Sequence, residues 1–326
     1  PRPVRGAGAR VASPVHPTPR ERSRAVEGQP NSYTRPCGGW GVTATVCLTF
    51  DFDAVSPWIH AFEEPTPTNL SRGTFGAHVG VPRVLDVLDR AGAPGTFFVP
   101  GHTVESFPAA CEAIHGAGHP IEHHGWSHTR PNEYGDAPSE RADVERGLEA
   151  LAALTGERPR GYRSPSWDFS PHTLSILRDL GFEYDSSAMG HDALPYYLRD
   201  DRNAPPGAPY EPGEPTEVLE FPVSWRFDDF PAFAFLSGRG GGQAAEAAVF
   251  ERWLDAVDWL ARRVEDAVFT LTRHPQVTGR VPVVGHFESF VDELVRRRDV
   301  DLRTLRSVAD EVERGERATF EPSPGA

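Results

Sequence analysis

Acidic and imidazole side chains occur in two short motifs whose spacing suits one chemical centre. Asp51 and Asp53 directly follow the apolar segment Thr43–Phe50. Two carboxylates this close repel each other unless a cation offsets their charge. His124 and His128 are four positions apart, which brings both imidazoles within reach of one ion. Asp53, His124 and His128 therefore form a candidate metal set of two histidines and one carboxylate, which leaves positions open for water and substrate.

Two further polar residues follow segments with strand character. Arg163 lies in the sequence GYRSPSW, and His274 follows the run FTLT in the sequence TRHP. Taken alone, each also has a plain structural interpretation, as a salt bridge for Arg163 and as a histidine bonded to backbone for His274. Because functional groups gather at the carboxyl ends of parallel strands, we expect both residues to join the aspartates and histidines there.

Aromatic residues lie in or beside the same motifs. Trp126, Trp167 and Trp225 can wall a small pocket or stack on a sugar ring, so we take them as candidate substrate-binding residues. Ordinary core packing is the alternative for each. His123 precedes the histidine pair and should point away from it, which leaves a substrate contact or a structural role.

From residue 43 onward, strand-like segments alternate with segments of helical periodicity. β-branched and apolar runs predict strands over 43–50, 95–99, 121–124, 217–221 and 267–271. Periodicity and cap residues predict helices over 81–91, 108–116, 139–154, 170–180, 244–264, 287–297 and 302–313, with Ser139 and Ser170 as two of the N-caps. Such alternation indicates parallel βαβ units, and about seven of them fit one barrel-like sheet better than two domains.

The composition excludes several classes of function. The 326 residues carry 33 basic and 47 acidic side chains, and the net charge of −14 argues against nucleic acids or anionic membranes as partners. All 33 of these basic residues are arginine, so a lysine Schiff base is excluded. There is no apolar run long enough for a transmembrane helix. Because no signal-peptide pattern is visible, we expect a cytoplasmic protein.

The ends of the chain differ from its centre. Residues 1–36 hold seven prolines and seven arginines against two acidic residues, without apolar periodicity. We expect this segment to be a disordered or surface-draped tail. Residues 37–318 should form the barrel, and residues 319–326 a short C-terminal tail.

Five short motifs in order resemble those of the polysaccharide deacetylases, carbohydrate esterase family 4. Thr49–Asp53 resembles the family's Thr-Phe-Asp-Asp with one residue inserted between the acids, and His124–His128 resembles His-(Ser/Thr)-x-x-His. The other similar segments are Arg163–Trp167, Tyr184–Ser187, Phe221–Trp225 with Asp228 and Asp229, and Leu271–Pro275. With a further similarity at Ser71–Gly76, the resemblance covers about residues 40–315.

The inserted residue, and Gly125 in the hydroxyl position of the second motif, are similar to one subgroup of that family. This subgroup includes a Helicobacter peptidoglycan deacetylase, cyclic imide hydrolases and metal-free allantoinases. Because both His124 and His128 are retained, the metal-free branch is not favoured. The resemblance implies a single-domain distorted (β/α) barrel of about seven parallel strands. It also implies a metal-dependent hydrolase of carbon–nitrogen bonds other than peptide bonds.

The resemblance assigns a role to each candidate residue. Asp53, His124 and His128 would bind a divalent metal; the expected ion is Zn²⁺, with Co²⁺, Ni²⁺ and Fe²⁺ as alternatives. Asp51 would be the general base, with Arg163 paired to it. His274 would protonate the leaving nitrogen.

Three functions remain open from the sequence. The first is removal of an N-acetyl group from an amino sugar or polysaccharide. The second is ring opening of a cyclic imide or ureide by the same chemistry, for which a small-molecule amide is the substrate. The third is a catalytically silent carbohydrate-binding barrel, which the intact set of polar residues disfavours. Relatives of this kind are often tetramers, so we also expect a homo-oligomer.

Overall fold

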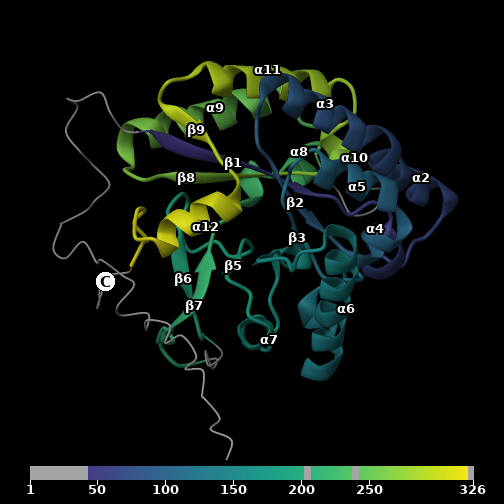
Figure 1. Cartoon of the computed structure of the whole chain (residues 1–326), viewed down its shortest axis with the longest axis vertical. Helices are drawn as coiled ribbons and strands as arrows, with labels where there is room; N and C mark the ends of the chain where they lie inside the picture. The colour runs from purple at the N-terminus through teal and green to yellow at the C-terminus, as the bar shows by residue number, and fades with distance from the viewer. Residues whose placement is uncertain (1–42, 202–206, 237–241, 322–326) are drawn as a thin grey trace, which may run out of the picture.

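The structure is a computed structural model that describes residues 43–201, 207–236 and 242–321 (Figure 1). The predicted N-terminal tail over residues 1–36 lies outside these ranges, as do residues 322–326 of the predicted C-terminal tail. The described part of that tail contacts the rest of the protein. The Phe320 amide donates to the Pro195 carbonyl at 2.7 Å, and the Phe320 ring lies 4.7 Å from the ring of His191.

The described strands form one nine-stranded sheet. They are β1 (Ala44–Asp51), β2 (Thr96–Val99), β3 (Ile121–His123), β4 (Gly161–Tyr162), β5 (Tyr184–Asp185), β6 (Tyr196–Arg199), β7 (Pro215–Glu220), β8 (Val268–Arg273) and β9 (Val300–Leu302). Their order is β6-β7-β5-β4-β3-β2-β1-β8, and β9 pairs with the beginning of β1. Only the β6–β7 pair of this sheet is antiparallel. The seven strands from β7 to β8 in the order of the sheet are parallel and make up the curved wall.

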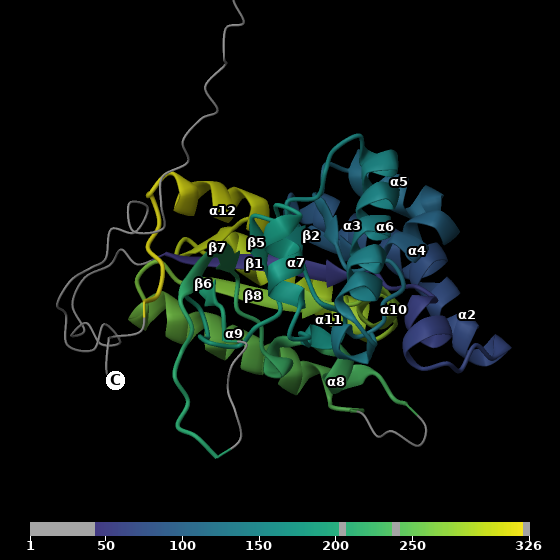
Figure 2. The same cartoon turned by 90° about the horizontal axis from the view of Figure 1, so that it is seen from below.

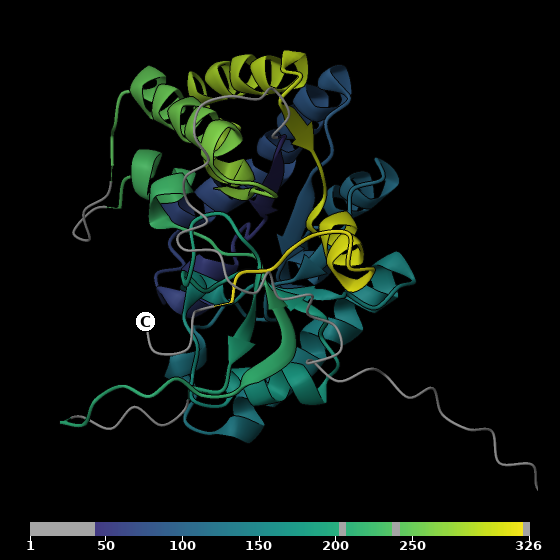
Figure 3. The same cartoon turned by 90° about the vertical axis from the view of Figure 1, so that its left-hand side faces the viewer.

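The helices between these strands surround the sheet. They are α2 (Pro67–Phe75), α3 (Val81–Ala91), α4 (Gly101–Ser106), α5 (Pro108–Gly116), α6 (Ala137–Thr155), α7 (Thr173–Asp179), α8 (Asp229–Phe233), α9 (Glu246–Arg263), α10 (Pro275–Thr278), α11 (Val283–Arg296) and α12 (Leu305–Glu313). Helices α9 and α12 lie on opposite sides of the strands (Figure 2). Figure 3 shows the same separation, with α9 in green and α12 in yellow.

The curved sheet does not close into a complete barrel by strand pairing. Strands β6 and β8 are the two ends of the described sheet and do not form a ladder with each other. Among the described residues, these two sides of the sheet are joined by an isolated bridge between Asp228 and Thr272, and by the Val268 amide, which donates to the Ala193 carbonyl at 2.7 Å. The expected distorted barrel in one domain is therefore confirmed, with an antiparallel strand and β9 added to the seven predicted strands.

Strand β1 has two different buried faces. Val46, Leu48 and Phe50 belong to the apolar cluster beneath the outer helices. Side chains alternate along a strand, so Thr49 lies on the opposite face, where its hydroxyl donates to the Leu271 carbonyl at 2.9 Å. Asp51 shares the face of Thr49, since Arg163 donates to both side chains. The alternation of β1 thus aims its final residue into the barrel.

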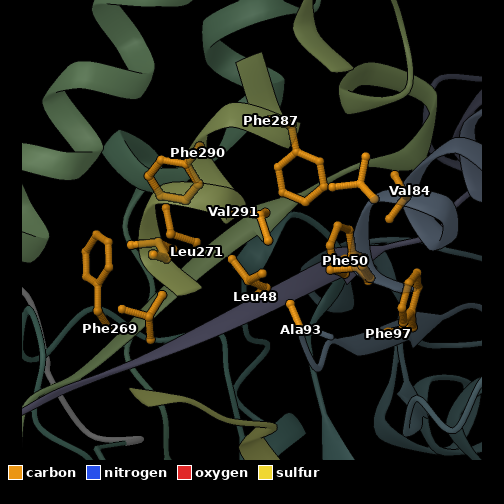
Figure 4. Close-up of a cluster of buried hydrophobic side chains, with 14 of the residues drawn as sticks. Leu48, Phe50, Val84, Ala93, Phe97, Phe269, Leu271, Phe287, Phe290 and Val291 are labelled. Atoms are coloured by element: carbon orange, nitrogen blue, oxygen red, sulfur yellow. The ribbon is translucent and has the colours of Figure 1, made fainter. Parts of the chain in front are cut away.

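The largest core cluster fixes β1 and β8 beneath two helices. Side chains from these strands and from α3 and α11 point toward one another in Figure 4. Phe50 stacks on Phe97 at 4.7 Å and meets Phe287 edge-on at 6.0 Å. These contacts bury large aromatic surfaces, each worth roughly 1.5–3 kcal/mol for a fully buried side chain. The core therefore holds the strand that carries Asp51 rigidly.

The predicted helix bounds hold best where proline and glycine mark them. The helices predicted over 81–91 and 108–116 have those same bounds in α3 and α5. The two serine caps are wrong. Helix α6 begins at Ala137, because Asp136 rather than Ser139 caps it by accepting from the Ser139 amide at 2.8 Å. Helix α7 begins at Thr173, and Ser170 instead accepts from the His172 amide.

In the described ranges, none of the helices combines the length and the apolar character that a membrane span requires.

Candidate active site

A cavity of about 1130 Å³ lies where the predicted motifs come together. Asp51 ends β1 and Asp53 follows it, while His124 comes directly after β3 and His274 after β8. These side chains line the cavity together with His128. The structure thus brings them to one end of neighbouring parallel strands, where loops leave room for a ligand.

Asp53, His124 and His128 each direct one ligand atom at a common point. Asp53 Oδ1 lies 3.5 Å from His124 Nε2 and 3.6 Å from His128 Nε2. All three ligand atoms lie within 4.8 Å of one another. In a tetrahedral zinc site with bonds of ~2.0 Å, ligand atoms are about 3.3 Å apart. The three atoms therefore have a spacing that suits one small divalent ion.

The protonation states also suit a cation. His124 Nδ1 donates to the Arg163 carbonyl at 2.7 Å, which leaves the Nε2 lone pair free. Burial lowers the pKa of His124 to about 3 and that of His128 well below its usual value. Burial raises the pKa of Asp53 to about 8, and its Oδ1 has no hydrogen-bond partner among the described residues. Two neutral imidazoles facing an orphaned carboxylate oxygen fit a metal ion, which would use both lone pairs and offset the buried charge.

Backbone strain concentrates around this centre. His128 has φ +63°, and Ala54, which follows Asp53, has φ +49°. Ser166 and Trp167 on the cavity wall have φ +58° and +55°. A left-handed conformation costs a residue with a Cβ roughly 1–2 kcal/mol. The surrounding packing must hold these residues in place, as is common at functional sites.

Arg163 fixes the carboxylate of Asp51. It is fully buried, and its Nη1 donates to Asp51 Oδ1 at 2.7 Å and to Thr49 Oγ1 at 2.9 Å. Its Nε and Nη2 donate to the carbonyl and hydroxyl oxygens of Ser186 at 2.8 and 2.7 Å. Since every guanidinium nitrogen has a partner, the fork cannot rotate, and Asp51 is held in one orientation.

His274 is held by two acidic residues behind it. Its Nδ1 lies 2.7 Å from Asp229 Oδ1 and 3.4 Å from Asp228 Oδ1, so Nε2 points into the cavity. Burial alone would lower the pKa of His274, but the Asp228 and Asp229 carboxylates raise it to about 10. These three residues could also hold an ion, but the Nδ1 bond to Asp229 already occupies that ligand atom. The arrangement instead keeps a proton on Nε2.

Two of the four predicted substrate-binding residues face the cavity. Trp167 and Trp225 line it and stack on each other, with ring centroids 4.3 Å apart and planes 28° apart. Trp225 is 47% exposed although it is a large apolar side chain. This exposed aromatic surface at the cavity can stack on a ring-shaped ligand.

The structure places His123 and Trp126 away from the cavity. His123 is fully buried; its Nε2 contacts the Val144 carbonyl at 2.9 Å and its Nδ1 accepts from the Gly125 amide. Both ring nitrogens therefore have partners, and the Nε2 contact joins β3 to helix α6. Trp126 lies under the guanidinium of Arg146, whose Cζ is 3.2 Å from the ring centroid. Neither residue lines the cavity, so the structural alternative suits both better than a substrate contact.

Sequence reasoning gave no role to Asp228, Asp229 and Gln276. Gln276 Nε2 donates to Asp53 Oδ2 at 3.1 Å and so holds the Asp53 carboxylate in place. The signal for the aspartates was the pair of acids at the start of the short helix α8, where Asp228 is the N-cap and accepts from the Phe230 amide. For Gln276 the signal was its position two residues after His274, on the first turn of α10.

Comparison with known proteins agrees with this geometry. A family model described as polysaccharide deacetylase matches residues 43–184. The peptidoglycan deacetylase of Helicobacter pylori is 33% identical over 279 residues, which cover 82% of this chain and 95% of that protein. A peptidoglycan deacetylase-like protein of Gibberella zeae is 32% identical over 76% of this chain and 79% of its own length.

Solved structures give the same result. A Mycobacterium smegmatis protein assigned to the polysaccharide deacetylases superposes with a TM-score of 0.74 at 32% identity, covering 91% of this chain and 99% of that one. The PuuE allantoinase has a TM-score of 0.68 at 20% identity over 90% of this chain and 96% of its own, a likeness of fold alone. This chain belongs to the polysaccharide deacetylase family. It is accordingly a hydrolase that acts on carbon–nitrogen bonds other than peptide bonds.

Proposed function

We propose that the protein is a metal-dependent deacetylase that removes an N-acetyl group from an amino sugar. The observation that carries the proposal is the orphaned Asp53 Oδ1 facing His124 Nε2 and His128 Nε2 at 3.5 and 3.6 Å. These residues would hold the metal, for which Zn²⁺ is our choice from the nitrogen and oxygen donors. When bound, the ion supplies a Lewis acid that polarises the substrate carbonyl and lowers the pKa of water.

The other residues handle protons and position. Asp51, fixed by Arg163, accepts a proton from the attacking water through Oδ2, the oxygen that Arg163 leaves free. His274 donates the proton on Nε2 to the leaving nitrogen, because an amine leaves poorly as an anion. Asp229 holds the His274 ring through Nδ1 so that Nε2 stays aimed at the centre. Acetate and a free amine are the products.

An amino sugar is favoured over a small ring by the shape of the cavity. Its volume of about 1130 Å³ exceeds what one small cyclic imide would fill, and the stacked Trp167 and Trp225 offer a flat aromatic wall. Two relatives are named as a peptidoglycan deacetylase and a peptidoglycan deacetylase-like protein, which supports the same substrate class.

The test is activity of zinc- and cobalt-loaded protein on two panels of substrates. One panel contains N-acetylglucosamine oligomers, and the other contains succinimide and hydantoin-like rings. We expect acetate release from the oligomers and no ring opening. Ring opening without acetate release would instead establish the cyclic imide or ureide hydrolase. Catalytic silence on both panels by metal-loaded protein would contradict the proposal.

A further inference from the structure

Two arginines in the wall of the cavity have no acidic partners among the described residues. Arg72 belongs to α2, and Arg280 follows α10; both line the cavity. Among the described residues, no carboxylate forms an ion pair with either of them, although the chain has a net charge of −14. The third cavity arginine, Arg130, differs, because Glu133 lies 3.7 Å from it.

Aromatic rings hold both guanidinium groups in place. The Arg72 guanidinium lies 4.8 Å from the centroid of Trp58, and its Nη2 donates to the Phe235 carbonyl at 2.9 Å. The Arg280 guanidinium lies 3.9 Å from the centroid of the Phe75 ring. Burial, and after it the positive charge of Arg280, lower the pKa of Arg72. Like charges placed together at a partly desolvated site are costly unless an anion binds between them.

Close backbone contacts place this pair beside the reacting centre. A Cβ on Gly73 would lie 2.4 Å from the Ala54 carbonyl oxygen, so α2 packs directly on the turn that carries Asp53. Gln276 connects the other arginine to the same residue: its side chain donates to Asp53 Oδ2, and its carbonyl accepts from Arg280 Nε at 3.2 Å. Both arginines thus belong to segments that contact Asp53 or its neighbour Ala54.

The remaining donors suit a carboxylate. Each guanidinium has five N–H donors in a planar fork, and the hydrogen bonds that Arg72 and Arg280 make within the described residues use one nitrogen of each. Stacking on an aromatic ring fixes the plane of the fork, which favours bidentate binding of a planar anion. The same cavity is also lined by the aromatic rings of Trp167 and Trp225, so it offers both a stacking surface for a ring and charged donors for an anion.

We propose that Arg72 and Arg280 form a subsite for a carboxylate borne by the substrate, so that the preferred substrate is an anionic amide. This inference rests on the proposed function for the position of the scissile bond. The anionic group occupies the wall formed by α2 and the segment after α10, and the acetamido or ring amide reaches the centre at Asp53.

The experiment measures binding by calorimetry in zinc-loaded Asp51→Asn protein, where hydrolysis does not interfere. Two matched pairs of ligands differ by a carboxylate: N-acetylglucosamine against N-acetylmuramic acid, and dihydrouracil against dihydroorotate. We expect the carboxylate member of at least one pair to bind about 10-fold more tightly than its neutral partner, a difference of about 1.4 kcal/mol. Equal affinities within both pairs, or no binding of either carboxylate, would overturn the subsite.

Variants show whether the preference comes from these two residues. In the same background, Arg72→Gln with Arg280→Gln should abolish the preference, while Arg72→Lys with Arg280→Lys should keep part of it by retaining the charges. Arg130→Gln is the matched control, because it changes a cavity arginine that already has an acidic partner; it should leave the ratio unchanged. A preference that survives the double glutamine variant would contradict the assignment.

Two further results separate this inference from its alternatives. Inorganic phosphate is titrated in parallel, and tight phosphate binding without any carboxylate preference would overturn the substrate subsite in favour of a free-anion site. The binding ratio does not depend on turnover. Inactivity on both substrate panels therefore contradicts the proposed function. Equal affinities for the charged and neutral ligands of each pair, together with normal turnover of the wild type, contradict only the subsite.

Discussion

His274 Nε2 lies 4.0 Å from Asp51 Oδ2, and both side chains line the cavity. The same nitrogen is 3.8 Å from Asp53 Oδ2. The proposed proton acceptor and the proposed proton donor therefore lie next to each other at the edge of the candidate metal set. In the proposed mechanism both groups approach one substrate amide from the same end of the cavity, Asp51 at the attacking water and His274 at the leaving nitrogen.

Replacement of Asp51 by Asn tests the proposed base. The amide keeps the shape of the carboxylate and can still accept from Arg163 Nη1, but it cannot take a proton. We expect kcat to fall by ~10²–10⁴-fold, with KM and bound zinc little changed. Steady-state kinetics on an N-acetylglucosamine oligomer and metal analysis measure both. A variant with wild-type kcat would exclude Asp51 as the base.

Removal of the aromatic wall should weaken substrate binding. Trp225→Ala removes the exposed ring that stacks on Trp167, and a stacking contact is worth ≈ 0.5–1.5 kcal/mol. We expect KM for an oligomer to rise roughly 2- to 12-fold with a smaller effect on kcat. Trp259→Ala is the matched control, because Trp259 is 49% exposed on α9 and does not line the cavity. Equal effects of the two changes would contradict a binding role.

A buried pair of carboxyl groups beneath the site should make stability depend on pH. Burial raises the pKa of Asp185 to about 6 and raises that of Glu220 well above its usual value, with the Asp185 charge as its second cause. Above about pH 4 the native state then binds more protons than the unfolded state. The free energy of unfolding therefore decreases as the pH rises from about 4 through 6 and beyond. Asp185 Oδ2 and Glu220 Oε2 lack hydrogen-bond partners among the described residues.

Glu220→Gln removes one of these charges and keeps the acceptor. Its amide oxygen can still accept from the Ser187 and Ala188 amides. We expect the melting temperature of the variant to exceed that of the wild type at pH 8, with the advantage shrinking or reversing at pH 4.5. Calorimetry at both values measures this. If the difference in melting temperature between variant and wild type were the same at both pH values, the Asp185–Glu220 pair would not be the cause of the pH dependence.

Helix α6 approaches β3 too closely for any side chain at Gly147. A Cβ there would lie 2.4 Å from His123 Nε2 and 2.9 Å from the Gly125 carbonyl oxygen. Gly147→Ala should therefore destabilise the protein by about 1–3 kcal/mol, despite the better helix propensity of alanine. Gly116→Ala is the control, since nothing lies within 4 Å of a Cβ at that helical glycine. Urea unfolding should show that the control is neutral or slightly more stable; similar losses in both variants would contradict the packing account.

The sequence predicts those parts of the fold that local chemistry determines. The ends of α3 and α5 follow from prolines at their first turns and from glycines at or next to their last. Strands β4 and β5 were not predicted, because two-residue strands have no periodicity and exist only through pairing with neighbours. Ser139 is a residue type that often caps helices, but here Asp136 is the N-cap and accepts from the Ser139 amide. The course of the backbone before the helix decides which of the two residues is the cap.

In the site as well, local spacing could be predicted and tertiary contacts could not. Asp53, His124 and His128 were predicted because their spacing along the chain already suits one ion. The tertiary contacts of Gln276 with Asp53, and of Arg72 with the Phe235 carbonyl, join segments that are far apart in sequence. For His123 the sequence left a substrate contact and a structural role open, and the alternation along β3 turns its ring toward α6, where it contacts the Val144 carbonyl.

The most direct test of the account is anomalous diffraction at the zinc edge from crystals of zinc-loaded protein. We predict one strong peak per chain, bounded by Asp53 Oδ1, His124 Nε2 and His128 Nε2, and no such peak in Asp53→Asn crystals. A peak between Asp228, Asp229 and His274, or no peak at all under stoichiometric zinc, would contradict the proposed metal centre and the hydrolytic mechanism built on it.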